Sequence, residues 1–491
     1  MRRAIIFGVV AVLVAIAIIV PVALYFNKTQ DLSCYPEFDG SESCYATSKA
    51  SAYRWYGPKT DYTICTGLSG SDAKQVKYPG CTPIMLYLFN RHSARYPDPD
   101  DVEKMQGILY RVRDLTMEAA AKGKVKLCQQ DIEELRKWKP TYSTVEAAEA
   151  MKQGETDVHQ IADRFKKMFP TLLPSKYAQE QFKFGISNRI RTNQSLYAFI
   201  ERIFDPSEMD SVVYPKKDVR LISFHKTCER KVWPNRTKPS REMFTEPEAF
   251  RKSPIADRFA QNVKSRLGLE NTNLTYSDLR QIAVECAVAF TADRESPWCA
   301  VFSKEDMMVQ EYDDDIYDFY KDSYGRPLNP KMGCPIVNEA TGLFTTAMNE
   351  PEKSHIKSVI YVAHSRDYKK LLGSFDLFRD EQPLTSGSLF VIKGDYCTDR
   401  VQNRQWRDAK MSPYSANIGF VLFKCEGTFK VLTLINERPV KLPKCSYPKD
   451  DFLCDAREFI SKNRFSNCNI DKICVPKART EQWPDSHWED K

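Results

Sequence analysis

Three groups of arginine and histidine side chains stand at separate points of the 491-residue sequence. The groups are Arg91, His92 and Arg95, then Arg189 and Arg191, then His364 and Arg366. Because like charges repel, cations gathered in this way indicate an anionic ligand between them. A guanidinium group suits a phosphate, since its planar fork holds two oxygens and keeps its charge. A histidine among such arginines can attack phosphorus and form a phosphohistidine, so the pattern indicates phosphoryl-transfer chemistry at His92.

Each of these side chains also has a purely structural interpretation. Arginines at helix starts are often solvated or paired with acids, and a single histidine is often structural. The spacing of the first group favours function, because Arg-His-x-x-Arg-x-Pro would arise by chance in about one such chain in a thousand.

The same groups mark turns between predicted strands and helices. Short apolar runs at 82–89, 182–187 and 356–363 predict strands, and each is followed by a segment of helical periodicity. Turns of this kind, beside the amides of a helix N-terminus, are natural anion sites. Asp98, Asp100 or Asp101 is expected to cap the first of the helices. The alternating segment 417–440 predicts a hairpin at the sheet edge. Together these elements predict an α/β fold, a layered mixed sheet flanked by helices.

The chain is expected to divide into four parts. Residues 1–26 contain Arg2, Arg3 and an apolar run that would form a helix of about 34 Å, which predicts a signal anchor or signal peptide. Residues 27–77 would be an N-terminal extension. Residues 78–204 and 346–470 would form the α/β domain, and residues 205–345 an inserted, mostly helical cap domain. Basic residues before the apolar run predict an inside N-terminus, with the remainder lumenal or extracellular as a single-pass membrane or secreted protein.

The cysteines and the net charge limit the function classes. Fifteen dispersed cysteines without a CxxC motif predict disulfides in the secretory pathway, with one cysteine left over. Asn-x-Ser/Thr triplets at Asn235 and Asn273 predict a glycoprotein. The net charge of +7 is spread along the chain, which argues against nucleic-acid binding.

The segment RHSARYP resembles the signature of the histidine acid phosphatases, the clade-2 histidine phosphatases. The segments SNRIRTNQSLYAFI, SPWCAVF, YKDSYGRPLNPKMGCPI and HSRDYKKLLGSFDLFRDEQPL extend the resemblance, most closely to the multiple inositol polyphosphate phosphatases. The resemblance implies the histidine phosphatase fold and stepwise removal of phosphates from inositol polyphosphates such as phytate. It also implies that no metal or other cofactor is required.

The resemblance further implies a role for individual residues. His92 matches the family's nucleophile. The family's phosphate-binding side chains match Arg91, Arg95, Arg191 and His364. Ser195 matches a serine that follows the downstream arginine by four positions.

The sequence departs from the family at the proton donor. The family's tripeptide is His-Ala-Glu, whereas this chain has His364-Ser365-Arg366. Arginine keeps its proton and cannot protonate a leaving alkoxide. Asp367 is one residue further, about 100° around a helix, and is a possible proton donor. Three alternatives stay open: Asp367 or another carboxylate replaces the acid, the enzyme loses the roughly 10²–10⁴-fold that an acid contributes, or the protein binds polyphosphates without efficient turnover.

Five basic residues in the predicted cap could line a pocket for a polyanion. They are Lys216, Lys217, Arg220, His225 and Lys226. The simpler interpretation is a solvated face of the cap.

Overall fold

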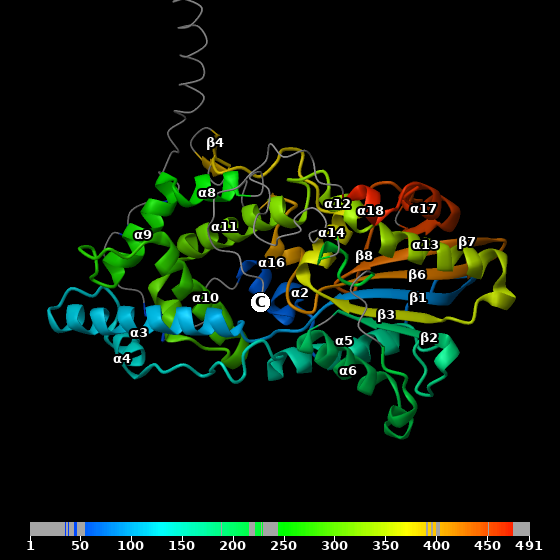
Figure 1. Ribbon diagram of the computed structural model, residues 1–491, viewed down its shortest axis with the longest axis horizontal. Helices are drawn as coiled ribbons and strands as arrows, with labels where there is room; N and C mark the ends of the chain where they lie inside the picture. Colours follow the sequence, from blue (N-terminus) through cyan, green and yellow to red (C-terminus); the bar gives the residue numbers. More distant parts are fainter. Residues whose placement is uncertain are drawn as a thin grey trace, which may run out of the picture.

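A computed structural model describes residues 55–474 apart from 188, 216–220, 227, 229–243, 389–390, 394–395, 399–402 and 450, together with residues 35, 38 and 44–46. Its main feature is a seven-stranded mixed sheet with the order β2-β3-β1-β6-β7-β8, in which β9 also pairs with β7 (Figure 1). The strands of this sheet are β1 (Cys81–Arg91), β2 (Phe182–Ile186), β3 (Ser358–Ala363), β6 (Asn417–Cys425), β7 (Thr428–Ile435), β8 (Arg438–Val440) and β9 (Leu453–Asp455). A separate hairpin joins β4 (Val391–Lys393) and β5 (Tyr396–Thr398). The predicted α/β class with a layered mixed sheet is confirmed.

The parallel part of the sheet brings the predicted turns to one edge. β1 and β2 both pair with β3 in parallel, with Arg91 opposite Ala363 and Ile186 opposite Val362. All three strands therefore end at the same edge, and the residues that follow them meet there.

The predicted hairpin exists, but its expected place in the sheet was wrong. β6 and β7 pair antiparallel around Glu426–Gly427, and β6 continues the sheet beside β1. β8 and β9 cover β7, so the hairpin is not an edge. Each of these covering strands has three residues, which is too short to show a periodic pattern.

Side chains alternate between the two faces of the sheet and join two cores. Leu86 and Leu88 of β1 pack with α5 (Lys152–Met168) and α6 (Ile190–Ile203). Tyr87 and Phe89 belong to the core that includes α13 (Cys334–Asn349), α14 (Ser365–Ser374) and α17 (Ala456–Asn463). The period of two along a strand produces this division, and Figure 1 shows helices on both sides of the sheet.

Helices make up every described element between β2 and β3 other than short 3₁₀ turns. They are α6, α8 (Thr245–Arg251), α9 (Pro254–Arg266), α10 (Tyr276–Asp293), α11 (Lys304–Asp322), α12 (Asn329–Met332) and α13. α3 (Pro99–Ala121) and α4 (Gln129–Lys137) lie beside this helical part, at the left in Figure 1. The other described helices are α2 (Tyr62–Thr66), α16 (Asp408–Met411) and α18 (Ile470–Ile473). The four domain boundaries given above stay a prediction.

Buried ion pairs tie α11 to the sheet-facing elements. Asp318 of α11 pairs with Lys369 of α14, and Asp322 pairs with Lys370. Glu311 pairs with Arg407, whose Nε lies 2.6 Å from Oε1. Removing one partner of such a pair leaves a buried charge without compensation, so these contacts hold α14 in a defined position.

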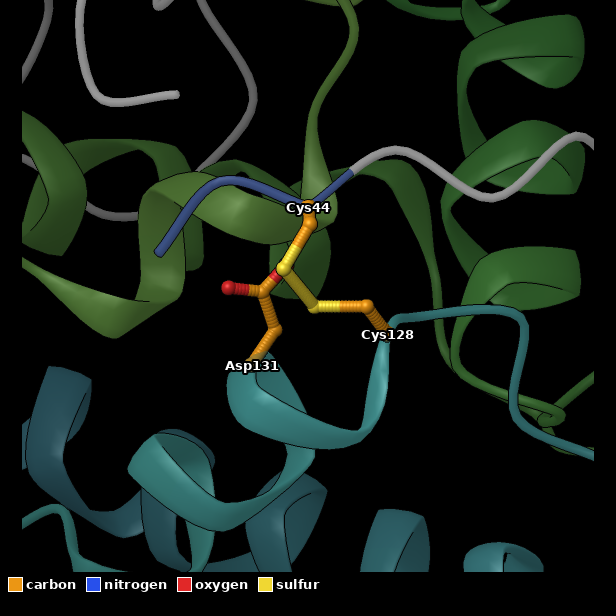
Figure 2. A group of neighbouring side chains, drawn as sticks. All are labelled: Cys44, Cys128 and Asp131. Atoms are coloured by element: carbon orange, nitrogen blue, oxygen red, sulfur yellow. A yellow bond between two sulfur atoms is a disulfide. The ribbon is translucent and has the colours of Figure 1, made fainter. Parts of the chain in front are cut away.

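Six disulfides confirm the prediction from the dispersed cysteines. The pairs are Cys44–Cys128, Cys81–Cys425, Cys228–Cys474, Cys286–Cys299, Cys334–Cys468 and Cys445–Cys454. Cys65 has a free thiol. Figure 2 shows Asp131 beside the Cys44–Cys128 bond, where its carboxylate accepts backbone N–H groups of Tyr45 and Ala46 at 2.9 and 2.8 Å. This carboxylate therefore fixes the chain at the disulfide.

The predicted membrane segment at 1–26 lies outside the described residues. Among the helices that the structure describes, none combines the length and apolarity needed to cross a bilayer. Of the two predicted glycosylation sites, Asn235 also lies outside the described residues, and the Asn273 side chain accepts a hydrogen bond from Arg111.

Candidate active site

His92 is the first residue after β1 and lies at the edge where the parallel strands end. Its backbone N–H donates to the Ala363 carbonyl of β3 at 2.9 Å, so the sheet register positions it. The ring Nδ1 lies 2.9 Å from the Ser93 carbonyl oxygen, which requires a proton on Nδ1 and leaves the lone pair on Nε2. Burial and the charges of Arg191 and Arg91 hold the pKa of His92 well below its usual range. The neutral imidazole is therefore the stable form of the unliganded site, as a nucleophile requires.

Arg91 is the last residue of β1, and its guanidinium lies buried beside His92. Its Nη1 donates to the Ser412 carbonyl at 2.6 Å, and the group lies 4.5 Å from the centre of the Tyr414 ring. Within the described residues its buried Nε has no hydrogen-bond partner. Burial, reinforced by the nearby charge of Arg95, lowers the pKa of Arg91 to about 10. A buried cation with an unpaired donor indicates space for an anionic oxygen.

Arg191 and Arg95 complete the cationic group with a single carboxylate between them. Arg191 is in the first turn of α6, and its Nη1 lies 3.6 Å from Asp98 Oδ1. Arg95 approaches the other oxygen of Asp98 at 3.3 Å. Burial and the charge of Arg95 lower the pKa of Arg191 to about 9, and its buried Nε has no partner among the described residues. One carboxylate does not neutralise two guanidiniums, so the group keeps an excess of positive charge.

His364 enters the same site from the end of β3. It precedes α14 and its Nε2 lies 2.8 Å from the hydroxyl oxygen of Ser187, which follows β2. The ring centres of His364 and His92 are 5.5 Å apart. Burial, followed by the charges of His92 and Arg191, holds the pKa of His364 well below its usual range. A bound phosphate would offset this repulsion.

Ser195 locks α6 onto the turn that carries His92. Its hydroxyl oxygen accepts the Ser93 N–H at 2.9 Å and donates to the Arg191 carbonyl at 2.7 Å. On the other side of this turn, Gly154 of α5 approaches Ala94 so closely that a Cβ would lie 2.5 Å from the Ala94 carbonyl oxygen. Close packing therefore fixes the turn before any ligand binds.

Arg366, which the sequence resemblance places at the family's proton-donor position, points to α11. Its Nε donates to Asp322 Oδ1 at 3.1 Å, and Lys370 contacts the same carboxylate. Burial disfavours the charge of Asp322, but Lys370 and Arg366 together lower the pKa of this carboxyl far below its usual range. Asp322 is therefore an ion-pair partner and holds no proton to donate.

Asp367 is fully buried and contacts a histidine from the predicted cap. Its Oδ1 lies 2.6 Å from His225 Nδ1, and its Oδ2 has no hydrogen-bond partner among the described residues. Only 2% of His225 is exposed, so the interpretation as a solvated face was wrong for this residue. Lys216, Lys217 and Arg220 lie outside the described residues. The role of Asp367 as the direct proton donor stays a prediction.

The site uses residues that sequence reasoning missed. Asp98 was expected to cap a helix, but no side-chain capping bond is present and its carboxylate serves Arg95 and Arg191. Its place three residues after Arg95 was the available signal. Ser187 and Tyr414 gave no local signal, because only the packing of distant segments places them against His364 and Arg91.

A family comparison agrees with this geometry. Residues 85–437, more than half of the chain, match the histidine phosphatase superfamily, branch 2. The chain belongs to this superfamily. The matched range contains His92 and extends beyond His364.

Named relatives are multiple inositol polyphosphate phosphatases. The Drosophila melanogaster protein, multiple inositol polyphosphate phosphatase 1, is 26% identical over 407 residues, which are 80% of this chain and 82% of that protein. The Gallus gallus protein of the same name is 26% identical over 415 residues, 81% of this chain and 86% of that protein.

Solved structures of a phytase and of a multiple inositol polyphosphate phosphatase share the fold. The phytase from D. castellii has a TM-score of 0.62 at 17% identity, covering 83% of this chain and 87% of the phytase. The Bifidobacterium longum multiple inositol polyphosphate phosphatase in complex with inositol hexasulfate has a TM-score of 0.57 at 12% identity, covering 82% of this chain and 96% of the Bifidobacterium protein.

Replacing Arg191 by alanine is expected to weaken inorganic phosphate binding by about 10–100-fold, since charge-assisted hydrogen bonds contribute about 1.5–3 kcal/mol. Titration calorimetry measures this directly. The matched control is Arg202→Ala on the same helix, where the half-exposed guanidinium pairs with Asp163 and phosphate affinity should not change. Equal affinities of the Arg191→Ala variant and the wild type would contradict the phosphate site.

Proposed function

We propose that this protein is a phosphomonoesterase that removes phosphates from inositol polyphosphates through a phosphohistidine intermediate. The decisive observation is the arrangement of His92, whose Nε2 carries the lone pair while guanidinium groups that a single carboxylate only partly neutralises lie around it. The names of the relatives, inositol polyphosphate phosphatases and a phytase, support the substrate class.

The residues divide the work of the first half-reaction. Arg91, Arg95 and Arg191 would hold the phosphate oxygens, and His364 would supply a further hydrogen bond. His92 Nε2 would attack phosphorus in line with the departing oxygen. The guanidinium charges stabilise the negative charge of the transferring group, and the packed turn keeps their geometry fixed. No step requires a metal.

A second candidate function is polyphosphate binding without efficient turnover. The observation behind it is Arg366, a cation at the acid's place that is engaged with Asp322. The intact His92 arrangement and the enzymatic relatives favour the phosphatase.

Incubation of the purified protein with inositol hexakisphosphate tests the proposal. We expect release of inorganic phosphate and successive lower inositol phosphates, resolved by ion-exchange chromatography, with inositol hexasulfate as a competitive inhibitor. Binding of the hexakisphosphate without phosphate release would contradict the phosphatase and support the binding protein.

We also propose that the protein enters the secretory pathway, with the folded part lumenal or extracellular and residues 1–26 as anchor or signal peptide. The disulfides support an oxidising compartment. Expression in eukaryotic cells tests this: a glycan at Asn273 that a glycosidase removes is expected. A protein found in the cytosol with its cysteines reduced would contradict the proposal.

A further inference from the structure

We propose that His225, positioned by Asp367, gives the proton to the leaving oxygen, in place of the glutamate that other family members have where this chain has Arg366. This inference rests on the proposed phosphatase function. It names a catalytic residue outside the family's signature segments.

The contact between His225 and Asp367 fixes the ring. Nδ1 lies 2.6 Å from Asp367 Oδ1, and the backbone N–H of His225 donates to the same oxygen at 3.4 Å. Only 2% of His225 and none of Asp367 are exposed, so solvent does not compete for this hydrogen bond. A carboxylate on Nδ1 sets the orientation of an imidazole and balances the charge of its protonated form. Because Nδ1 is engaged with Asp367, the ring atom left to exchange a proton is Nε2.

The position of His225 relative to the nucleophile suits a donor. Its ring centre is 6.4 Å from that of His364, which in turn is 5.5 Å from that of His92. His225 is close enough for its charge to lower the pKa of His364. The three imidazoles therefore border one site. An in-line displacement needs the donor near the oxygen opposite the attacking nitrogen, so the donor must come from a residue that borders the site without being the immediate neighbour of His92.

The first half-reaction balances with His225 as the acid. The lone pair of His92 Nε2 forms the bond to phosphorus while the bond from phosphorus to the inositol oxygen breaks. The electron pair of the broken bond stays on that oxygen, which takes the proton from His225 Nε2. Inositol leaves as the alcohol, and His225 becomes neutral.

Water completes the second half-reaction. His225 Nε2 takes a proton from water as the water oxygen bonds to phosphorus. The bond between phosphorus and His92 breaks, and its electron pair returns to Nε2. Inorganic phosphate leaves, and the protonated form of His225 is restored.

Other acidic residues near the start of α14 are held in ion pairs. Asp322 pairs with Lys370 and Arg366. Asp318 pairs with Lys369, although 13% of its side chain is exposed. Asp318 is therefore the competing donor that an experiment must separate from His225.

The test compares two leaving groups in the His225→Gln variant. p-Nitrophenolate departs without a proton, whereas the inositol alkoxide requires one. We expect kcat/KM for inositol hexakisphosphate to fall by about 10²–10⁴-fold, and that for p-nitrophenyl phosphate to stay close to the wild-type value. Retained activity on the aryl ester also shows that the variant is folded. Asp367→Asn should likewise lower kcat/KM for inositol hexakisphosphate and leave kcat/KM for p-nitrophenyl phosphate nearly unchanged. The control is His159→Gln on α5, a half-buried histidine paired with Glu201, which should change neither value.

Each alternative result overturns the inference in a recognisable way. If His225→Gln keeps both activities, or loses both equally, His225 is not the proton donor. If Asp318→Asn shows the selective loss instead, Asp318 is the donor. In these cases the proposed phosphatase function stands. If the wild-type protein cleaves p-nitrophenyl phosphate but not the hexakisphosphate, the chain has no acid for alkoxide departure. If it cleaves neither, the phosphatase proposal fails together with this one.

Discussion

Replacing His92 by alanine is expected to lower kcat on both p-nitrophenyl phosphate and inositol hexakisphosphate by on the order of 10⁴–10⁶-fold. The reason is that Nε2 forms the covalent intermediate. Without it the site has no nucleophile for the phosphoryl group, and water must attack phosphorus directly. Steady-state phosphate release measures the effect.

Binding should survive the loss of His92. Arg91 and Arg95 flank His92 in the chain and Arg191 comes from α6, and the contacts of these guanidiniums are with other groups than the imidazole. Inositol hexasulfate affinity, measured by calorimetry, is therefore expected to change far less than kcat. His92→Asn is a second variant that keeps a side-chain N–H donor near the Ser93 carbonyl, and its loss of turnover should be similar.

A control variant and a trapping experiment complete this test. His355→Ala, at an exposed histidine, is the control that should keep full activity. Rapid quenching of the wild-type reaction in alkali should trap a phosphoryl adduct on His92, detectable by mass spectrometry and lost in acid. Turnover retained in His92→Ala, or an adduct on another residue, would exclude the proposed phosphohistidine at this position.

Replacing Asp322 by alanine is expected to lower the free energy of unfolding by about 3–5 kcal/mol. Asp322 is buried on α11 and compensates the charges of Lys370, which is fully buried, and of Arg366. Its removal leaves the buried ammonium group of Lys370 without a carboxylate, and of the ion pairs between α11 and α14 the one between Asp318 and Lys369 remains. Guanidinium chloride titration followed by circular dichroism measures the change.

The pH dependence identifies the cause of this destabilisation. Lys370 and Arg366 depress the pKa of Asp322 in the folded protein, so the stabilisation is fully present above the unfolded pKa of about 4. It is lost as the pH falls from there towards the depressed folded pKa. The difference in the free energy of unfolding between the wild type and Asp322→Ala should therefore be largest at neutral pH and become smaller below about pH 4. Asp72→Ala, which removes an exposed partner of Lys167, should have no measurable effect. A difference independent of pH would attribute the effect to lost packing instead.

Local patterns in the sequence were sufficient for the layout of the site. The apolar runs before Arg91 and His364 predicted two of the strands, because a buried parallel strand is a short, almost continuous hydrophobic segment. Parallel strands end at one edge, so the cations that follow them were expected to meet. The structure brings His92 and His364 together there, with Arg191 beside Asp98.

Contacts between distant segments decided the side-chain partners within the site. The hydrogen bond between His225 and Asp367 joins residues 142 positions apart, and that between Arg366 and Asp322 joins residues 44 apart. Neither pair has a spacing that a helix or strand period could reveal. The sequence showed that Arg366 replaces an acid, but not that its guanidinium turns to α11.

The sequence by itself determined the residue types that the chemistry of this protein needs: a group of guanidiniums, a histidine among them and a missing glutamate. These follow from residue type and from short-range periodicity, which a linear chain displays directly. Only the tertiary structure decided which side chains share the low-dielectric space around the phosphate. Burial turns Asp322 and Asp367 from ordinary acids into specific partners, because a buried charge is stable only next to its counter-charge, and only the folded chain determines which residue supplies that counter-charge.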